Sequence, residues 1–108
     1  MAGTFSIKAL GEGQLAASKG TIYTVPGATQ AIIKTITLVN ETAGALTCNL
    51  YLKTGSTSRR IIPKDLSLGA GESLETDTDY TLEAADLVEG DASSATSIDY
   101  TINGIEES

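Results

Sequence analysis

Apolar and polar residues alternate along most of the chain, and clusters of Gly, Pro, Asn and Asp separate the alternating segments at intervals of about 8–12 residues. In residues 46–53 Leu46, Cys48, Leu50 and Leu52 share one face of a strand, while Thr47, Asn49, Tyr51 and Lys53 share the other. One face is therefore expected in the core and the other in water. The pattern predicts eight strands, over Thr4–Leu10, Thr21–Val25, Ala31–Asn40, Ala45–Lys53, Arg59–Ile62, Glu72–Asp77, Asp86–Asp91 and Ser97–Ile105.

Eight short antiparallel strands predict an all-β fold, a single two-sheet β-sandwich over residues 1–108 with a jelly-roll-like topology. Fifteen threonines agree with this fold, because β-branched side chains fit a pleated, half-exposed surface. The segment Thr81–Leu87 has a helix-like composition but is too short for an independent helix, so we interpret it as a strand followed by a turn. The ends, Met1–Gly3 and Glu106–Ser108, are expected to fray.

The residue types needed for common catalytic sites are missing. The chain has no histidine, which excludes Ser-His and Cys-His nucleophile pairs and histidine-assisted zinc sites. Its only cysteine, Cys48, falls on the apolar face of a strand and is expected to be a buried, unreactive residue. The segment Gly11-Glu12-Gly13 lacks the rest of a phosphate-binding loop. The sequence therefore predicts neither an enzyme nor a cofactor site.

Other ligand classes are also disfavoured. The acidic run Glu72, Glu75, Asp77 and Asp79 lacks the spacing of a calcium loop, and no metal site is predicted. The net charge of −7 and the absence of a basic stripe disfavour nucleic-acid binding. No apolar stretch approaches the roughly 20 residues of a membrane helix. The N-terminus shows no secretory signal pattern, so we expect synthesis in a reducing cytoplasm.

The charges divide unevenly along the chain. Residues 1–64 hold seven bases and two acids, a net charge of +5, whereas residues 65–108 hold twelve acids and no base, a net charge of −12. Two interpretations remain open. The halves of one domain can interleave and mix their charges, as sequential halves of a β-fold usually do. Alternatively, neighbouring copies can present faces of opposite charge to one another.

The paired bases Arg59 and Arg60 are the candidate interface residues of the basic half, and Asp77 and Asp79 are those of the acidic half. Adjacent strand residues point to opposite faces, so at most one of the two arginines can join a given patch. For each arginine, a surface salt bridge within the chain and a contact to another subunit remain alternatives.

Several motifs resemble those of a known group. Thr21–Asn40 reads TIYTVPGATQAIIKTITLVN, and it is followed by the Asn-Leu-Tyr-Leu of residues 49–52 and by LSLGAGESLETD at residues 66–77. From about Gly20 to Ile105 the chain resembles a widespread group of small phage-encoded β-proteins found among virion structural genes. The resemblance implies a component of a phage particle, either a capsid decoration (cement) protein or a small tail or fibre module.

The short chain favours the decoration protein, because a fibre module usually belongs to a longer chain with a shaft. We therefore expect a homo-oligomer in the virion, bound to the major capsid protein or to other virion proteins and made in the host cytoplasm. One alternative is a tail-associated module that binds a host-surface glycan or protein, which would have to use Tyr23, Tyr51, Tyr80 and Tyr100. Another is a host-directed regulator built on a β-sandwich.

Overall fold

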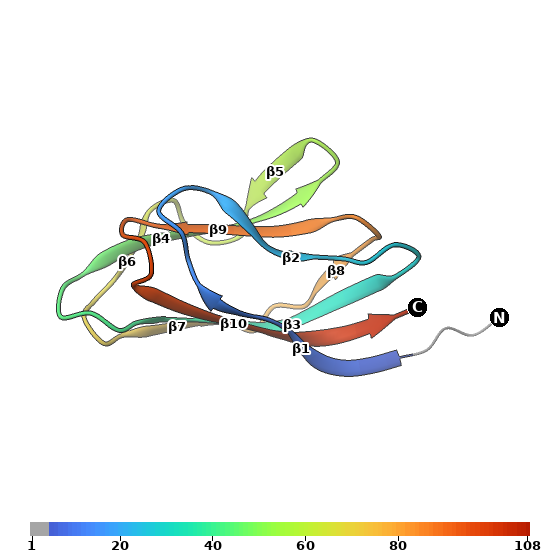
Figure 1. Ribbon diagram of the computed structural model, residues 1–108, viewed down its shortest axis with the longest axis horizontal. Coiled ribbons are helices and arrows are strands. Elements are labelled where there is room, and N and C mark those ends of the chain that lie inside the picture. Colours follow the sequence, from blue (N-terminus) through green and yellow to red (C-terminus); the bar gives the residue numbers. More distant parts are fainter. Residues whose placement is uncertain (1–4) are drawn as a thin grey trace.

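The computed structural model describes residues 5–108, which form ten β-strands in two sheets that face one another (Figure 1). The strands are β1 (Phe5–Gln14), β2 (Gly20–Thr24), β3 (Gln30–Asn40), β4 (Leu46–Thr54), β5 (Thr57–Arg60), β6 (Leu66–Leu68), β7 (Ser73–Thr76), β8 (Tyr80–Leu82), β9 (Leu87–Ala92) and β10 (Ile98–Glu107). The predicted start of the first strand at Thr4 and the predicted fraying of Met1–Gly3 lie outside the described residues.

Each sheet combines strands from distant parts of the sequence. The first sheet has the order β1-β10-β3-β7, with β8 also paired to β3. The second has the order β2-β9-β4-β5, with β6 also paired to β4. All pairings are antiparallel. The first four strands alternate between the two sheets. Each of the last two strands then lies between two of these in its own sheet, β10 between β1 and β3, and β9 between β2 and β4. This is the jelly-roll order, so the predicted fold is confirmed.

All eight predicted strands are present, and the structure adds two more. The added strands, β6 and β8, have three residues each, which is too few for an alternation pattern to be recognised. They share the edges of the sheets with other short strands, because β7 and β8 pair with opposite ends of β3 while β5 and β6 pair with opposite ends of β4. The interpretation of Thr81–Leu87 is confirmed, since β8 ends at Leu82 and a turn follows in which the Glu83 N–H donates to Asp86 Oδ2.

The core lies between the two sheets. Ile33, Ile36, Leu38, Leu50 and Ile102 are fully buried there. Cys48 is fully buried as predicted, and desolvation by burial, followed by the nearby negative charge of Asp91, raises the pKa of its thiol. The sandwich is thus filled mainly by aliphatic side chains, as the scarcity of aromatic residues requires.

The expectation that the outer face of residues 46–53 is in water is wrong at two positions. Asn49 is 5% exposed and Tyr51 is 8% exposed, although both point away from the core. The pattern within the strand could not show this, because the residues that cover them come from β5, from Asp65 and from the loop before β2.

The predicted fraying of Glu106–Ser108 is wrong for its first two residues. β10 continues to Glu107, where Glu106 and Glu107 pair with Ser6 and Phe5 of β1. The Tyr23 hydroxyl donates to Glu106 Oε2 at 2.5 Å, which connects the end of β10 to the second sheet. Burial and then the hydrogen bond to this carboxylate raise the pKa of Tyr23.

The basic and acidic halves of the chain interleave in both sheets. β1–β5 come from residues 1–64 and β6–β10 from residues 65–108, and each sheet contains strands from both sets. Ion pairs join the halves directly, from Lys19 Nζ to Glu89 Oε1 at 3.9 Å and from Lys34 Nζ to Asp79 Oδ2 at 2.9 Å. The interpretation that the halves mix their charges within one domain is therefore confirmed.

Asn40, the last residue of β3, joins the two sheets through its fully buried side chain. Its Nδ2 donates to the carbonyl oxygens of Gly44 and Leu68, and its Oδ1 accepts from the N–H and the hydroxyl of Thr42. Asn40→Ala removes four hydrogen bonds, among them the buried one to the Leu68 carbonyl oxygen, so we expect the free energy of unfolding to fall by about 2–3 kcal/mol. Urea unfolding measures this loss. An equal loss for Asn103→Ala, at an exposed asparagine of β10, would contradict the assignment.

Candidate interaction surfaces

A polar cluster covers the outer face of β4 in the second sheet. We define the Tyr51 cluster as Lys19, Asn49, Tyr51, Arg60, Asp65 and Asp91. Asn49 is its centre, because Asn49 Nδ2 donates to Asp65 Oδ1 at 3.0 Å and to Asp91 Oδ1 at 2.8 Å. Asn49 Oδ1 accepts from Arg60 Nη1 and from the backbone N–H of Asp65. The side-chain amide therefore uses both of its polar atoms within the cluster.

Two cations contact the ring of Tyr51. Lys19 Nζ lies 4.4 Å from the ring centroid and Arg60 Cζ lies 5.0 Å from it, both within the range of cation–π attraction. The Tyr51 hydroxyl donates to Asp91 Oδ2 at 3.1 Å. Desolvation by burial, then this hydrogen bond to Asp91, raises the pKa of the phenol. These contacts connect β4 with β5, with β9 and with the loop before β2. The polar atoms of the Tyr51 cluster thus bind one another and stabilise the fold, and they are not presented to a ligand.

The cluster is expected to contribute to stability through Asn49. Asn49→Ala removes four hydrogen bonds, two of them to carboxylates and one to a guanidinium. We expect the free energy of unfolding to fall by about 2 kcal/mol, because hydrogen bonds to charged groups contribute more than neutral ones, although the exposed Arg60 and Asp65 regain water. Thermal or urea unfolding measures the change. Lys53→Ala on the same face of β4 is the matched control, and a loss as large as that of Asn49→Ala would contradict this role.

The structure separates the predicted interface residues. Arg60 lies opposite Tyr51 in the β4–β5 register and joins the Tyr51 cluster, while Arg59 lies opposite Leu52 on the other face. Asp77 and Asp79 lie in the connection between β7 and β8, in the other sheet. Among residues 5–108, neither arginine forms an ion pair with either aspartate. The contact between subunits that these four residues were chosen for stays a prediction.

The rest of the acidic run is also dispersed. Asp79 binds Lys34, and Glu72 Oε1 accepts a hydrogen bond from the Gly69 N–H at 2.6 Å. Within the part of the chain that the structure describes, no group of three or more acidic or cysteine side chains is placed to hold a metal ion. The same residues include no helix long and apolar enough to span a membrane.

An exposed apolar strip, not recognised in the sequence, crosses the outer face of the first sheet. We define the apolar strip as Phe5 and Ile7 of β1, Ile105 of β10 and Ile32 of β3. Phe5 is 69% exposed and Ile7 is 88% exposed, while Ile105 and Ile32 are half-buried. Ile7 lies opposite Ile105, which lies opposite Ile32, so three isoleucines form a row across neighbouring strands. Beside them lies an open hollow of about 520 Å³.

A signal for this strip was present in the sequence. Residues that alternate along a strand point to opposite faces. Phe5 and Ile7 are odd-numbered, whereas Leu10, which packs against the core, is even-numbered. The strand has one face toward the core, so it cannot bury Leu10 together with Phe5 and Ile7. Apolar residues on both faces therefore indicate that one of the two faces exposes apolar side chains. The edge position of β1, which pairs only with β10 among the described strands, increases that exposure.

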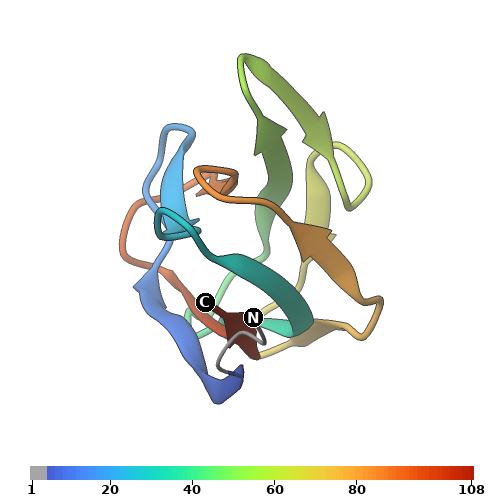
Figure 2. The same cartoon turned by 90° about the vertical axis from the view of Figure 1, so that its right-hand side faces the viewer.

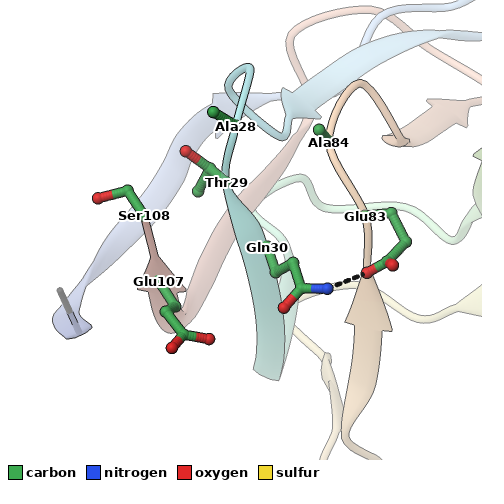
Figure 3. Close-up of a pocket in the computed structure, with 7 residues that line it drawn as sticks. All are labelled: Ala28, Thr29, Gln30, Glu83, Ala84, Glu107 and Ser108. Carbon is green, nitrogen blue, oxygen red and sulfur yellow. Dashed lines mark hydrogen bonds between the residues drawn. The ribbon is translucent and has the colours of Figure 1, made fainter. Parts of the chain in front are cut away.

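A second hollow lies at the end of the sandwich where the C-terminus of β10 meets two loops (Figure 3). Its volume is about 500 Å³, and it is lined by Ala28, Thr29, Gln30, Glu83, Ala84, Glu107 and Ser108. Gln30 Nε2 donates to Glu83 Oε2 at 2.8 Å across its wall. The two carboxylates are the only ionisable side chains of the lining, so this hollow is unsuited to an anionic ligand.

The four tyrosines do not form an exposed platform. Tyr23 and Tyr51 are buried, with 7% and 8% exposure, and both hydroxyls are hydrogen-bonded to carboxylates. Tyr80 and Tyr100 are half-buried and pack against the core. The aromatic surface on which the glycan-binding alternative depended is therefore absent from the described residues.

Similarity to solved structures is found at the level of the fold. No known protein family matches the sequence, and no curated protein is significantly similar to it. A chain of the acidic stable capsid of Helicobacter pylori bacteriophage KHP30 superposes with a TM-score of 0.58 at 11% identity, covering 100% of this chain and 90% of that one. A chain of Bacillus endospore appendages, described as disulfide-linked pili, gives a TM-score of 0.55 at 17% identity, covering 98% and 89%.

A chain of infectious bursal disease virus, Gx strain, gives a TM-score of 0.53 at 10% identity, covering 97% of this chain and 32% of that one. At such identities the similarities establish the fold alone. The molecule thus shares its β-sandwich with chains of two virus structures and of a bacterial surface appendage.

Proposed function

We propose that this chain is a structural protein of a bacteriophage particle, and that it is a decoration protein bound to the capsid. The observation that carries the proposal is the fold, which matches a chain of a bacteriophage capsid over 100% of this chain and 90% of that one. The resemblance of Gly20–Ile105 to phage virion proteins supports it independently. On this proposal the protein has no enzymatic activity, is made in the host cytoplasm and resides in the virion.

The apolar strip is the surface that we assign to the particle. Exposed apolar patches on small proteins mark places where another molecule binds, because burial of such a surface is favourable. Phe5 and Ile7 are the two large apolar side chains that remain exposed in the described chain. A copy docked through this strip, together with its neighbours, would add contacts across the shell, and many such contacts act together.

The pilus neighbour suggests a different assembly, which Cys48 disfavours. That appendage is described as disulfide-linked. In this chain Cys48 is the only cysteine, it is fully buried between the sheets, and burial raises the pKa of its thiol. A thiol in this state is a poor nucleophile for disulfide formation, so an assembly of this protein has to rest on non-covalent contacts.

The alternative of a tail or fibre module that binds a host-surface glycan or protein is less well supported. The four tyrosines that such a module would have to use are buried or packed against the core. A glycan array with the purified protein separates the two functions. Reproducible micromolar binding would favour the host-binding module over the decoration protein.

Quantitative mass spectrometry of purified phage particles tests the proposed function. A decoration protein occurs in many copies on each particle. We therefore expect its copy number and that of the major capsid protein to form a ratio of small whole numbers. A few copies per particle would instead favour a tail component. Absence from washed particles would overturn the proposal and favour a regulator that acts in the host.

A further inference from the structure

Two short segments of opposite charge stand out on the described surface. Residues 53–64 contain four bases and no acid, whereas residues 72–79 contain four acids and no base. The basic segment includes β5 of the second sheet, and the acidic segment includes β7 of the first. Among the described residues the two segments form no ion pair with one another. The charges of the two segments are therefore not paired with one another within the described chain.

The basic segment belongs to a hairpin that projects from the sandwich. β4 and β5 extend beyond the body of the second sheet (Figures 1 and 2). A hollow of about 560 Å³ adjoins this hairpin, lined by Leu52, Thr54, Thr57, Arg59, Arg60 and Ile61. Arg60 is held by Asn49 and by the ring of Tyr51. Arg59 is exposed and forms no ion pair within residues 5–108, so its guanidinium remains available in a hollow that Leu52 and Ile61 also line.

The acidic segment offers two unengaged carboxylates. Asp79 is bound to Lys34 and Glu72 to the Gly69 N–H, but Glu75 and Asp77 are exposed and form no ion pair in the part of the chain that is described. They lie at the end of β7, and the segment runs along one border of the first sheet.

Both segments also include a strand at the edge of a sheet. β5 pairs only with β4, and β7 pairs only with β3, among the described strands. Each has four residues. An edge strand keeps one row of backbone donors and acceptors unpaired, which allows another strand to pair with it.

We infer that β5 and the hollow beside it bind the acidic segment, residues 72–79, of a second copy of this protein. In this contact Arg59 pairs with Glu75 or Asp77 of the neighbour, and the short edge strands β5 and β7 lie side by side. The opposite charges of the two segments favour this partner over a basic or neutral one. The inference rests on the proposed function in one respect only, since it names a surface through which copies on a particle meet.

The two surfaces are different, so the contact is heterologous and each copy offers one surface of each kind. Such contacts close into rings or continue from copy to copy. A single exposed ion pair contributes little, so association in solution is expected to be weak, with a Kd of roughly 10 µM to 1 mM at low salt. On a particle, attachment of each copy to the shell would raise the local concentration and make the contact effective.

Sedimentation of the purified protein over a range of concentrations and salt tests the contact without any particle. We expect oligomers at low salt that dissociate toward 1 M salt, where the Debye length falls to about 3 Å. Arg59→Glu and the double variant Glu75→Lys/Asp77→Lys should each weaken association by roughly 5- to 20-fold. Glu12→Lys, a charge reversal at an exposed position of β1, is the matched control and should have no effect.

Mixing the two variants decides whether the contact joins different copies. Arg59→Glu makes the β5 surface acidic, and Glu75→Lys/Asp77→Lys makes the acidic segment basic, so each variant alone brings like charges together. In the mixture, the native acidic segment of the first variant can bind the native β5 surface of the second. We expect the mixture to associate about as tightly as the native protein. A monomer at every concentration, association unchanged by the reversals, or no recovery on mixing would each overturn the inference. Circular dichroism confirms that the variants are folded. Presence of the protein in virions would survive any of these results, so the two proposals fail separately.

Discussion

Ile7→Asp is expected to weaken attachment to the capsid by about 100-fold or more, while leaving the fold unchanged. Ile7 is 88% exposed in the described chain, so an aspartate at this position costs the isolated protein little. In the docked state the variant loses the burial of an isoleucine, about 1.5–3 kcal/mol, and it also places a carboxylate in an apolar contact. Together these effects exceed the 2.7 kcal/mol that corresponds to about a 100-fold change in affinity.

Binding to particles stripped of the native protein measures this loss, with thermal unfolding as the check on folding. Thr21→Asp is the matched control, because it adds the same charge at an exposed strand position of the second sheet. Equal attachment of Ile7→Asp and the native protein would show that the apolar strip does not face the shell. A fall in stability of several kcal/mol would show that the strip is part of the folding core instead.

Gly104→Ala is expected to lower the free energy of unfolding by about 3–5 kcal/mol, a large share of the stability of a domain of this size. A Cβ at Gly104 would lie 2.2 Å from the carbonyl oxygen of Ile32 and 2.8 Å from Leu10 Cδ1. The first of these atoms belongs to the neighbouring backbone, at the register shift between β10 and β3, and it cannot move without breaking the ladder. Glycine is therefore required at this register shift between β10 and β3.

Denaturant unfolding of Gly104→Ala and Gly44→Ala provides the comparison. A Cβ at Gly44 would meet no atom within 4 Å, so the same substitution there is expected to change stability by less than about 1 kcal/mol. A Gly104→Ala variant as stable as Gly44→Ala would mean that the register shift between β10 and β3 is relaxed in solution.

The long strands could be predicted because each carries its own signal. In β4 the alternation of Cys48 and Leu50 with polar residues identified both the strand and its buried face. The number of strands and the spacing of the turns then indicated a two-sheet sandwich. The strand β6 could not be predicted, because three residues hold no period and its place is set by pairing with β4. For β8, the segment Thr81–Leu87 indicated a strand and a turn but not the pairing of that strand with β3.

The candidate surfaces were predictable only in part. The strand period correctly separated Arg59 from Arg60, since one lies opposite Leu52 and the other opposite Tyr51. The burial of Asn49 and Tyr51 depends on Lys19, Asp65 and Asp91, which come from three other segments and have no local relation to β4. The pattern within one strand does not contain such contacts.

The location of the protein on the particle tests the central claim most directly. A cryo-electron microscopy reconstruction of the phage particle, at a resolution that shows individual strands, should place this β-sandwich on the outer surface of the head. Its apolar strip, Phe5, Ile7, Ile32 and Ile105, should face the shell, and copies should recur with the symmetry of the capsid lattice. Density for this sandwich at the tail alone, or a head surface without it, would contradict the proposed function.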